Sequence, residues 1–194
     1  VFTNITHDHL DYHKTFDEYI KAKKSFFDML PKGAFALINA DDKGGTVMVQ
    51  NTKANVRYFS LRKVTDFKAR LIENTLQGLH LEIGEQEIWA KLIGAFNAYN
   101  LLGTYGVAVL LGEDPVEALT VLSSLNTAAG RFDYIGSETD KITGIVDYAH
   151  TPDALENVLN TIQQIRTPLQ TVITVVGCGG NRDATKRPVM ADIA

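Results

Sequence analysis

The sequence predicts an α/β protein built from two successive units, and three observations lead to this fold class. Strand-like and helix-like stretches alternate along the first part of the chain. Residues 67–93 then interrupt this order with short, glycine-punctuated apolar runs, which are typical of antiparallel strands. Beyond Gly130 the order strand, helix, strand, helix favours a second, parallel α/β unit. We therefore expect one unit over residues 1–129 and another over residues 130–194.

Each element of the first unit is predicted from hydrophobic periodicity and from the residues that bound it. The expected strands are short apolar runs that end at turn residues: 1–5, 34–39, 56–60, 76–83 and 88–93. The expected helices are 15–30, 95–112 and 115–125, with one short helix before residue 56. Asp114 and Pro115 fit the N-cap and first position of the last helix, and Gly112 fits the end of the helix before it. This order predicts a parallel sheet with a small antiparallel sheet.

The second unit begins near residues 128–130. Strands are expected over 142–147 and 171–176, with a helix over 152–165 between them and another helix starting near Pro188. A Gly-rich turn follows the second strand, and such turns can present backbone N–H groups to an anion. Cys178 in this turn has no catalytic signature around it, so we expect it to be a small packing residue.

The composition excludes several classes of protein. The 194 residues are 45% hydrophobic and 22% charged, which are ordinary values for a soluble globular protein. A net charge of −4 argues against nucleic-acid binding, and no apolar run reaches the roughly 20 residues that a membrane helix needs. One cysteine cannot form an internal disulfide, and no signal peptide is evident. We expect a cytoplasmic monomer that neither binds nucleic acid nor inserts into a membrane.

A His-rich loop follows the first expected strand. His7, His9 and His13 lie there among Asp8 and Asp11. Loops at strand ends carry much of the chemistry of α/β proteins. Imidazoles and carboxylates packed this closely serve a metal or an anion, whereas the alternative is a polar loop of capping and turn residues.

Lys23 lies on the apolar face of the helix expected over 15–30. At about 100° per residue, that face holds Phe16, Tyr19, Ile20, Phe26, Phe27 and Leu30. Lys23 falls in its middle, so we expect Lys23 to lie inward, whereas Lys24 lies aside and should be an ordinary solvated charge. A buried ammonium is costly unless paired or neutralised. Either its long stem reaches solvent, or Lys23 is a neutral amine that adds carbon dioxide and becomes a metal-binding carbamate.

A series of short motifs runs through almost the whole chain. They are T-N-I at 3–5 with D-H-L-D-Y-H at 8–13, Y-I-K-A-K at 19–23, N-A-D-D at 39–42, G-A-F-N-A-Y-N at 94–100, G-R-F at 130–132, D-Y-A-H-T-P-D-A-L at 147–155, and G-C-G-G-N-R-D at 177–183 with K-R-P at 186–188. In this order they resemble the Mur ligases, the ATP-dependent enzymes that build the peptide of bacterial cell-wall precursors.

The resemblance implies a part of a larger fold. Residues 1–129 would be the latter part of a P-loop-type central ATPase domain, and residues 130–194 would begin a Rossmann-like C-terminal domain. The family's G-T-N/K-G-K-T phosphate loop is absent from the sequence, as is its D-N-P-R segment. Its metal-binding glutamate and its uridine-nucleotide domain are also expected upstream. We therefore expect a piece of a longer enzyme that does not catalyse alone.

The resemblance also implies an activity and a set of site residues. The reaction is ATP-dependent amide-bond formation through an acyl phosphate, with ATP and Mg²⁺ as cofactors. His9 and a carbamylated Lys23 would be the catalytic residues and hold Mg²⁺. The residues implied for ATP binding are Asn97, Asn100, Arg131, Asp147, His150 and Thr151. Arg182 would hold the carboxylate of the incoming amino acid.

Several of these residues have a structural interpretation as well. Asn97 or Asn100 fits a helix N-cap, and His150 or Thr151 fits a cap for the helix that begins at Pro152. Asp147 ends a strand, which is the usual place for a ligand carboxylate.

The motifs around residues 147–155 and 177–188 resemble one branch of the family most. That branch adds the third amino acid to a UDP-N-acetylmuramoyl dipeptide, and the G-C-G-G and K-R-P segments favour diaminopimelate over lysine as the diamino acid. A folylpolyglutamate synthase-like ligase is an alternative that the same segments disfavour. A zinc metallo-hydrolase is a second alternative, since residues 7–11 begin an H-x-H-x-D-H pattern that breaks at Tyr12.

Overall fold

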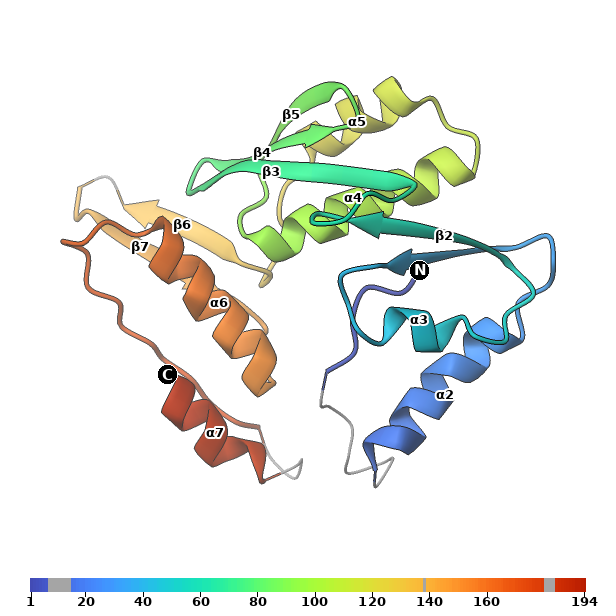
Figure 1. Cartoon of the computed structure of the whole chain (residues 1–194). Coiled ribbons are helices and arrows are strands. Elements are labelled where there is room, and N and C mark those ends of the chain that lie inside the picture. Colours follow the sequence, from blue (N-terminus) through green and yellow to red (C-terminus); the bar gives the residue numbers. More distant parts are fainter. Residues whose placement is uncertain (7–14, 138, 180–183) are drawn as a thin grey trace.

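A five-stranded mixed sheet forms the centre of the computed structural model, which describes residues 1–6, 15–137, 139–179 and 184–194 (Figure 1). Its strands, in spatial order, are β1 (Phe35–Asn39), β2 (Asn55–Ser60), β3 (Phe67–Thr75), β4 (Gly78–Ile83) and β5 (Gln86–Ala90). β1, β2 and β3 pair in parallel, whereas β3, β4 and β5 pair antiparallel. The predicted α/β class, with a parallel and an antiparallel part, is confirmed.

Helices cover both faces of the parallel part. α4 (Ala95–Leu110) packs across β1 to β4, and α5 (Pro115–Ser124) lies beside it at β5. α2 (Phe16–Asp28) and α3 (Gly45–Met48) pack together on the other face. Successive side chains of a strand point to opposite faces, so Leu37 joins the hydrophobic cluster under α4 and Ile38 joins the cluster with α2 and α3.

Local capping chemistry sets the helix boundaries. The Thr15 hydroxyl accepts a hydrogen bond from the Glu18 N–H at the start of α2. Asp114 caps α5 ahead of Pro115, as predicted, and Thr151 caps α6 (Pro152–Ile165) in the same way. The helices predicted over 15–30, 95–112, 115–125 and 152–165 therefore all form, with ends that differ by no more than a few residues.

The antiparallel strands deviate more from prediction. β4 starts at Gly78 and β5 covers residues 86–90, so both are shifted from the expected 76–83 and 88–93. Gly78 has φ +132°, and an added Cβ there would lie 2.1 Å from the Ala90 carbonyl oxygen, so this close approach requires glycine. β3 was not predicted as a strand, because its lysine, arginine and glutamate side chains obscure the apolar alternation.

The second unit contains β6 (Asp133–Ser137), β7 (Ile142–Val146), α6 and α7 (Lys186–Ile193). β6, which the sequence did not predict, pairs antiparallel with β7. The strand predicted over 171–176 is wrong, because these residues follow α6 without strand pairing in the described ranges. A strand needs a neighbour that supplies hydrogen bonds, and Ile173 and Val175 are left 85% and 95% exposed.

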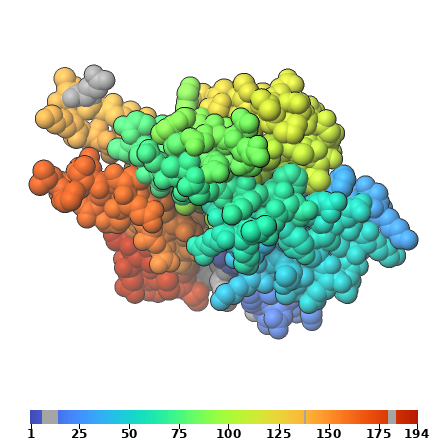
Figure 2. Space-filling view, turned by 45° about the horizontal axis from the view of Figure 1, so that its top comes forward, coloured from blue at the N-terminus to red at the C-terminus, as the bar shows by residue number. Residues whose placement is uncertain are grey.

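The N-terminal segment and the second unit flank the sheet. The strand predicted over residues 1–5 is reduced to one parallel bridge between Phe2 and Ile38. In the space-filling view the second unit, coloured orange to red, forms a lobe beside the blue-to-yellow first unit (Figure 2). Within the described residues, no helix is both long and apolar enough to cross a membrane.

The packing of α4 leads to a stability prediction. Leu102→Ala should lower the free energy of unfolding by about 2–5 kcal/mol, because Leu102 is fully buried and its loss leaves a cavity. Leu111→Ala is the matched control, since Leu111 follows the same helix and is 75% exposed, and it should change the free energy by less than about 0.5 kcal/mol. Urea unfolding followed by circular dichroism measures both, and equal effects would contradict this packing.

Candidate functional site

Asp41 joins three elements at the carboxyl end of the parallel strands. Its carboxylate accepts hydrogen bonds from the Ser60 hydroxyl at 2.8 Å, the Leu61 N–H at 2.9 Å and the Tyr99 hydroxyl at 3.0 Å. Burial by itself would raise the pKa of Asp41, but these hydrogen bonds outweigh it and lower that pKa below its usual value. Burial, followed by the bond to Asp41, raises the pKa of Tyr99 to about 12. The ends of β1 and β2 and the first turn of α4 thus meet at one carboxylate.

The same turn holds the start of the chain. Asn39 Nδ2 donates to the Thr3 carbonyl oxygen at 2.8 Å, and the Ile5 N–H donates to Asp42 Oδ2 at 3.3 Å. The N-A-D-D segment therefore positions the stretch that leads into the His-rich loop. The loop histidines, His9 among them, lie outside the described residues, and the metal role expected for His9 stays a prediction.

Lys23 is exposed, so the inward position predicted for it is wrong. Its ammonium lies 5.0 Å from the centre of the Tyr19 ring. The partly buried lysine of α2 is Lys24, whose side chain is 13% exposed and whose Nζ lies 2.6 Å from the Asp28 carboxylate. The helix-wheel pattern alone did not show this pairing, which balances the charge of the partly buried Lys24.

Asn97 and Asn100 lie on the first turn of α4 and bond to each other. Asn100 Nδ2 donates to Asn97 Oδ1 at 3.1 Å, and Asn97 Nδ2 donates to the Ile93 carbonyl oxygen at 2.8 Å. Neither residue is the N-cap, which is Gly94 with φ +96° and no side-chain cap bond, so the capping interpretation is wrong for this pair. Asn100 is exposed and Asn97 half-buried, which leaves amide groups at the surface.

Phe132 connects the start of α4 to the second unit. Its ring is fully buried and lies 6.1 Å, centre to centre, from the ring of Phe96. Its backbone has φ +49°, which is uncommon for a bulky residue, and its N–H donates to Asp147 Oδ2 at 2.7 Å. The carboxylate at the end of β7 is therefore bonded to the residue that packs beside the Asn97 turn.

Arg131 and His150 both lie close to the ring of Tyr148. The Arg131 guanidinium lies 5.1 Å from the centre of the Tyr148 ring, and the His150 ring lies 4.9 Å from the same centre. His150 Nδ1 is 3.0 Å from the Tyr148 carbonyl oxygen. Arg131 remains exposed, so its charge is accessible from solvent.

Thr151 and Asp153 begin α6. The Thr151 hydroxyl accepts a hydrogen bond from the Ala154 N–H at 3.2 Å, so the capping interpretation of Thr151 is confirmed. Burial, followed by repulsion from Glu156 and Asp42, raises the pKa of Asp153. Because Asp42 belongs to the turn after β1, the first turn of α6 and that turn share one electrostatic environment.

The Gly-rich turn is described only in part. Arg182 lies outside the described residues, and its expected contact with an amino acid stays a prediction. Cys178 Sγ lies 3.7 Å from the sulfur of Met190, which agrees with a packing role. In the ranges that the structure describes, no cluster of three or more His, Cys, Asp or Glu side chains is arranged to hold a metal ion.

Two family models match the chain. The model described as Mur ligase middle domain matches residues 1–108, and the model described as Mur ligase, glutamate ligase domain matches residues 130–194. The chain belongs to the Mur ligase family. The resemblance inferred from the sequence motifs is therefore confirmed, whereas the domain limits 1–129 and 130–194 stay a prediction.

Relatives agree with this assignment. The chain is 62% identical over all 194 residues to a UDP-N-acetylmuramoyl-L-alanyl-D-glutamate–2,6-diaminopimelate ligase of Cytophaga hutchinsonii, and it covers 40% of that protein. A solved structure of a ligase with the same name matches with a TM-score of 0.70 and 31% identity, over 99% of this chain and 40% of the solved one. A folylpolyglutamate synthase of Thermotoga maritima shares the fold, with a TM-score of 0.61 and 14% identity over 84% of this chain and 38% of its own. The chain thus spans about 40% of the length of the relatives that it matches.

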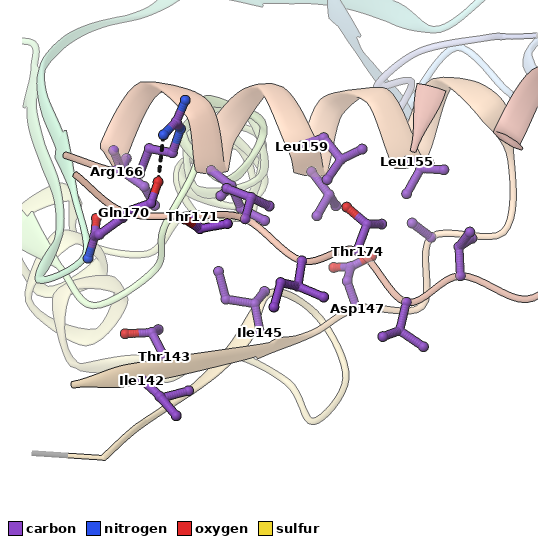
Figure 3. Close-up of a pocket in the computed structure, with 18 of the residues that line it drawn as sticks. Ile142, Thr143, Ile145, Asp147, Leu155, Leu159, Arg166, Gln170, Thr171 and Thr174 are labelled. Atoms are coloured by element: carbon purple, nitrogen blue, oxygen red, sulfur yellow. Dashed lines mark hydrogen bonds between the residues drawn. The ribbon is translucent and has the colours of Figure 1, made fainter. Parts of the chain in front are cut away.

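A cavity of about 910 Å³ lies within the second unit of this Mur ligase chain (Figure 3). Aliphatic side chains of β7, α6 and residues 169–176 line much of it, and Asp147 lies at its edge. The close-up shows residues 171–174 running between α6 and β7 without joining the sheet. Because Leu169, Ile173 and Val175 are 97%, 85% and 95% exposed, this space is open to solvent and is not a packed core, and Asp147 links it to the polar region around Asn97 and Arg131.

Sequence reasoning missed the residues that hold this region together. Asp41 and Tyr99 each lie within a recognised motif, but the motifs gave no sign that the two side chains meet. Phe132 is part of the G-R-F motif, and only the structure shows that it is the buried link to Phe96.

The two pKa shifts at Asp41 and Tyr99 predict how stability changes with pH. The folded-state pKa of Asp41 lies below 3.8, so its contribution is present above that value and is lost as the pH falls through the lower folded pKa. The folded-state pKa of Tyr99 lies above 10, so its contribution is complete below pH 10 and is lost as the pH rises toward 12. Thermal midpoints measured across pH should fall at both ends, and Tyr99→Phe should flatten the alkaline fall. An unchanged alkaline limb in that variant would contradict this prediction.

Proposed function

We propose that the complete protein is an ATP-dependent ligase that joins 2,6-diaminopimelate to the D-glutamate carboxylate of UDP-N-acetylmuramoyl-L-alanyl-D-glutamate. The observation that carries this proposal is the 62% identity, along every residue of the chain, to a relative with that name. Amide-bond formation through an acyl phosphate requires a nucleotide, a carboxylate and an amine to be held together, so the protein mainly positions groups and balances charge. The activity is proposed for the complete protein, of which this chain supplies a part.

The region between α4 and the second unit suits a nucleotide. Asn97 and Asn100 offer amide donors and acceptors to the adenine, and the exposed Arg131 guanidinium can reach the phosphates. Asp147 can accept from the ribose hydroxyls, because a carboxylate has several acceptor positions beyond the one that holds the Phe132 N–H. His150 and Thr151 complete the set, and Thr151 contributes through the α6 N-terminus that it caps.

Lys23 suits the formation of a carbamate that binds Mg²⁺. Its amine is exposed to dissolved carbon dioxide, and no carboxylate pairs with it in the described residues. The neutral Nζ forms a bond to the carbon of CO₂ and loses a proton, which produces a carboxylate-like group. Mg²⁺ prefers oxygen ligands, so this carbamate with His9 would hold the ion. When bound, Mg²⁺ neutralises charge on the phosphate and on the acceptor carboxylate.

The amino-acid substrate is assigned to the Gly-rich turn of the second unit. Arg182 is proposed to bind the carboxylate of the incoming diamino acid in two parallel hydrogen bonds, a geometry that lysine cannot reproduce. A cytoplasmic location and a monomeric state complete the proposal.

A folylpolyglutamate synthase-like activity is the second candidate, since one such enzyme shares the fold. It would use a folate and glutamate in place of the muramoyl dipeptide and the diamino acid. Membership of the Mur ligase family speaks against the zinc-hydrolase alternative.

The substrates separate these candidates. The complete protein, given ATP, Mg²⁺, UDP-N-acetylmuramoyl-L-alanyl-D-glutamate and diaminopimelate, should release phosphate and form the tripeptide. Lysine in place of diaminopimelate should react far more slowly, and a folate with glutamate should not react. Mass spectrometry of the product and phosphate release measure both steps. Turnover with folate and none with the dipeptide would replace the proposal by its alternative.

The carbamate predicts a chemical rescue. Lys23→Ala in the complete enzyme should lower kcat by a factor of about 100 or more, because a lost metal ligand removes charge neutralisation worth several kcal/mol. A small added carboxylate such as formate should restore part of the rate. Lys24→Ala is the neighbouring control, since Lys24 pairs with Asp28, and it should affect stability with no rescue by formate. Near-normal kcat in Lys23→Ala would show that Lys23 carries no metal role.

A further inference from the structure

The hydroxyl of Tyr99 in α4 donates a hydrogen bond to Asp41, which follows strand β1 of the sheet. In the described part of the chain, the bond from Tyr99 to Asp41 is the one side-chain hydrogen bond that runs from residues 95–110 to a strand end. The N-cap Gly94 has no side-chain cap of its own, but its N–H donates to Asn74 Oδ1 of β3 at 2.9 Å, so the start of α4 is tied to the sheet at two points, Asn74 and Asp41.

The Tyr99–Asp41 bond contributes to the direction in which the two asparagines project, together with the bond from Asn97 Nδ2 to the Ile93 carbonyl oxygen. With 3.6 residues per helical turn, Asn97 and Asn100 share one side of α4, and Tyr99 lies well round toward the opposite side. The sheet side of the helix carries the buried Ala98, Leu101 and Leu102. Tyr99 at the edge of this apolar stripe therefore limits rotation of the first turn about the helix axis, and this rotation sets where the asparagine amides point.

The acceptor is itself rigidly held. Asp41 receives both the Ser60 hydroxyl and the Leu61 N–H, so its carboxylate cannot follow a rotating tyrosine. The hydrogen bonds to Asp41 outweigh its burial and lower its pKa, whereas burial and the bond to Asp41 raise the pKa of Tyr99, so Asp41 stays charged and Tyr99 stays protonated throughout the neutral range. The bond from Tyr99 to Asp41 therefore does not change with pH in the neutral range.

We propose that Tyr99 and Asp41 are positioning residues that orient Asn97 and Asn100 toward the nucleobase and so contribute to the choice of ATP over other nucleotides. This inference rests on the proposed function, since it takes the asparagine pair as the adenine site. It adds a specific role for two residues that do not themselves touch the nucleotide.

The test compares Tyr99→Phe with Tyr105→Phe in the complete enzyme. Both changes remove one hydroxyl from α4, but the Tyr105 hydroxyl has no hydrogen-bond partner in the described residues, where its ring packs against Phe67. Tyr99→Phe should raise the KM for ATP about tenfold and leave kcat within about twofold, since a rotated first turn would misplace the asparagine amides, and the loss of about one hydrogen bond to the nucleobase lowers affinity by about one decade. The preference for ATP over GTP in kcat/KM should fall by a similar factor. Tyr105→Phe should leave all three values unchanged.

Calorimetric binding of ATP and GTP to the same variants keeps the test independent of ligase activity. If the wild type forms the tripeptide but Tyr99→Phe lowers only the unfolding temperature, the Tyr99–Asp41 bond is merely structural and the inference is overturned. If the wild type binds ATP but forms no tripeptide, the proposed ligase reaction fails, and the ATP-to-GTP affinity ratio of Tyr99→Phe still decides the inference. If the wild type binds no nucleotide, both the proposed function and the inference fail.

Asp41→Asn removes the charge of this side chain but keeps an oxygen that can accept the Tyr99 hydroxyl. It should therefore retain most of the ATP preference, which would show that the position of the hydroxyl matters more than the charge of Asp41.

Discussion

The partly buried carboxylate of Asp41 is the constraint on which the arrangement of the site depends. It bonds to the end of β2 and to α4, and it lies in the turn that holds the N-terminal segment through Asn39 and Asp42. A buried charge is tolerated only when its acceptor positions are filled, so loss of one donor weakens the hold on the others. The turn after β1 thus connects the N-terminal residues Thr3 and Ile5, the sheet and the first turn of α4.

Phe132 makes a second set of contacts, which connect the first turn of α4 to the second unit. A left-handed backbone at a buried aromatic residue is strained, and it persists because the ring packs against Phe96 while its N–H bonds to Asp147. The carboxylate of Asp147 is therefore held by the residue that also touches the start of α4. The contacts of Asp41 and of Phe132 share that first turn, so groups from both units are set relative to one helix.

Features that depend on neighbouring residues, such as helix ends, could be predicted from the sequence, whereas features that depend on contacts between distant residues could not. α5 and α6 were found because Asp114-Pro115 and Thr151-Pro152 are cap signals carried within four residues of the helix. Residues 171–176 read as a strand because they are apolar, yet a strand also needs a neighbour, and β7 pairs with β6. The Tyr99–Asp41 bond spans 58 positions, and no periodicity shows such a contact. The motifs imply a role for Asn97 and Asp147 in a site, whereas only the structure shows the hydrogen bonds that these two residues make.

Two adjacent lysines of α2 differ in their surroundings: Lys23 is exposed, whereas Lys24 is partly buried and pairs with Asp28. The helical periodicity predicts a buried Lys23 only if every aromatic side chain on its face is covered by the rest of the protein. The structure shows that one of them, Phe26, is 54% exposed. The covered stripe passes instead through Phe27 and the stem of Lys24, and Asp28 one turn on neutralises that ammonium. Lys24 therefore has the structural role on this helix, and the carbamate proposed for Lys23 would form on the exposed side of α2.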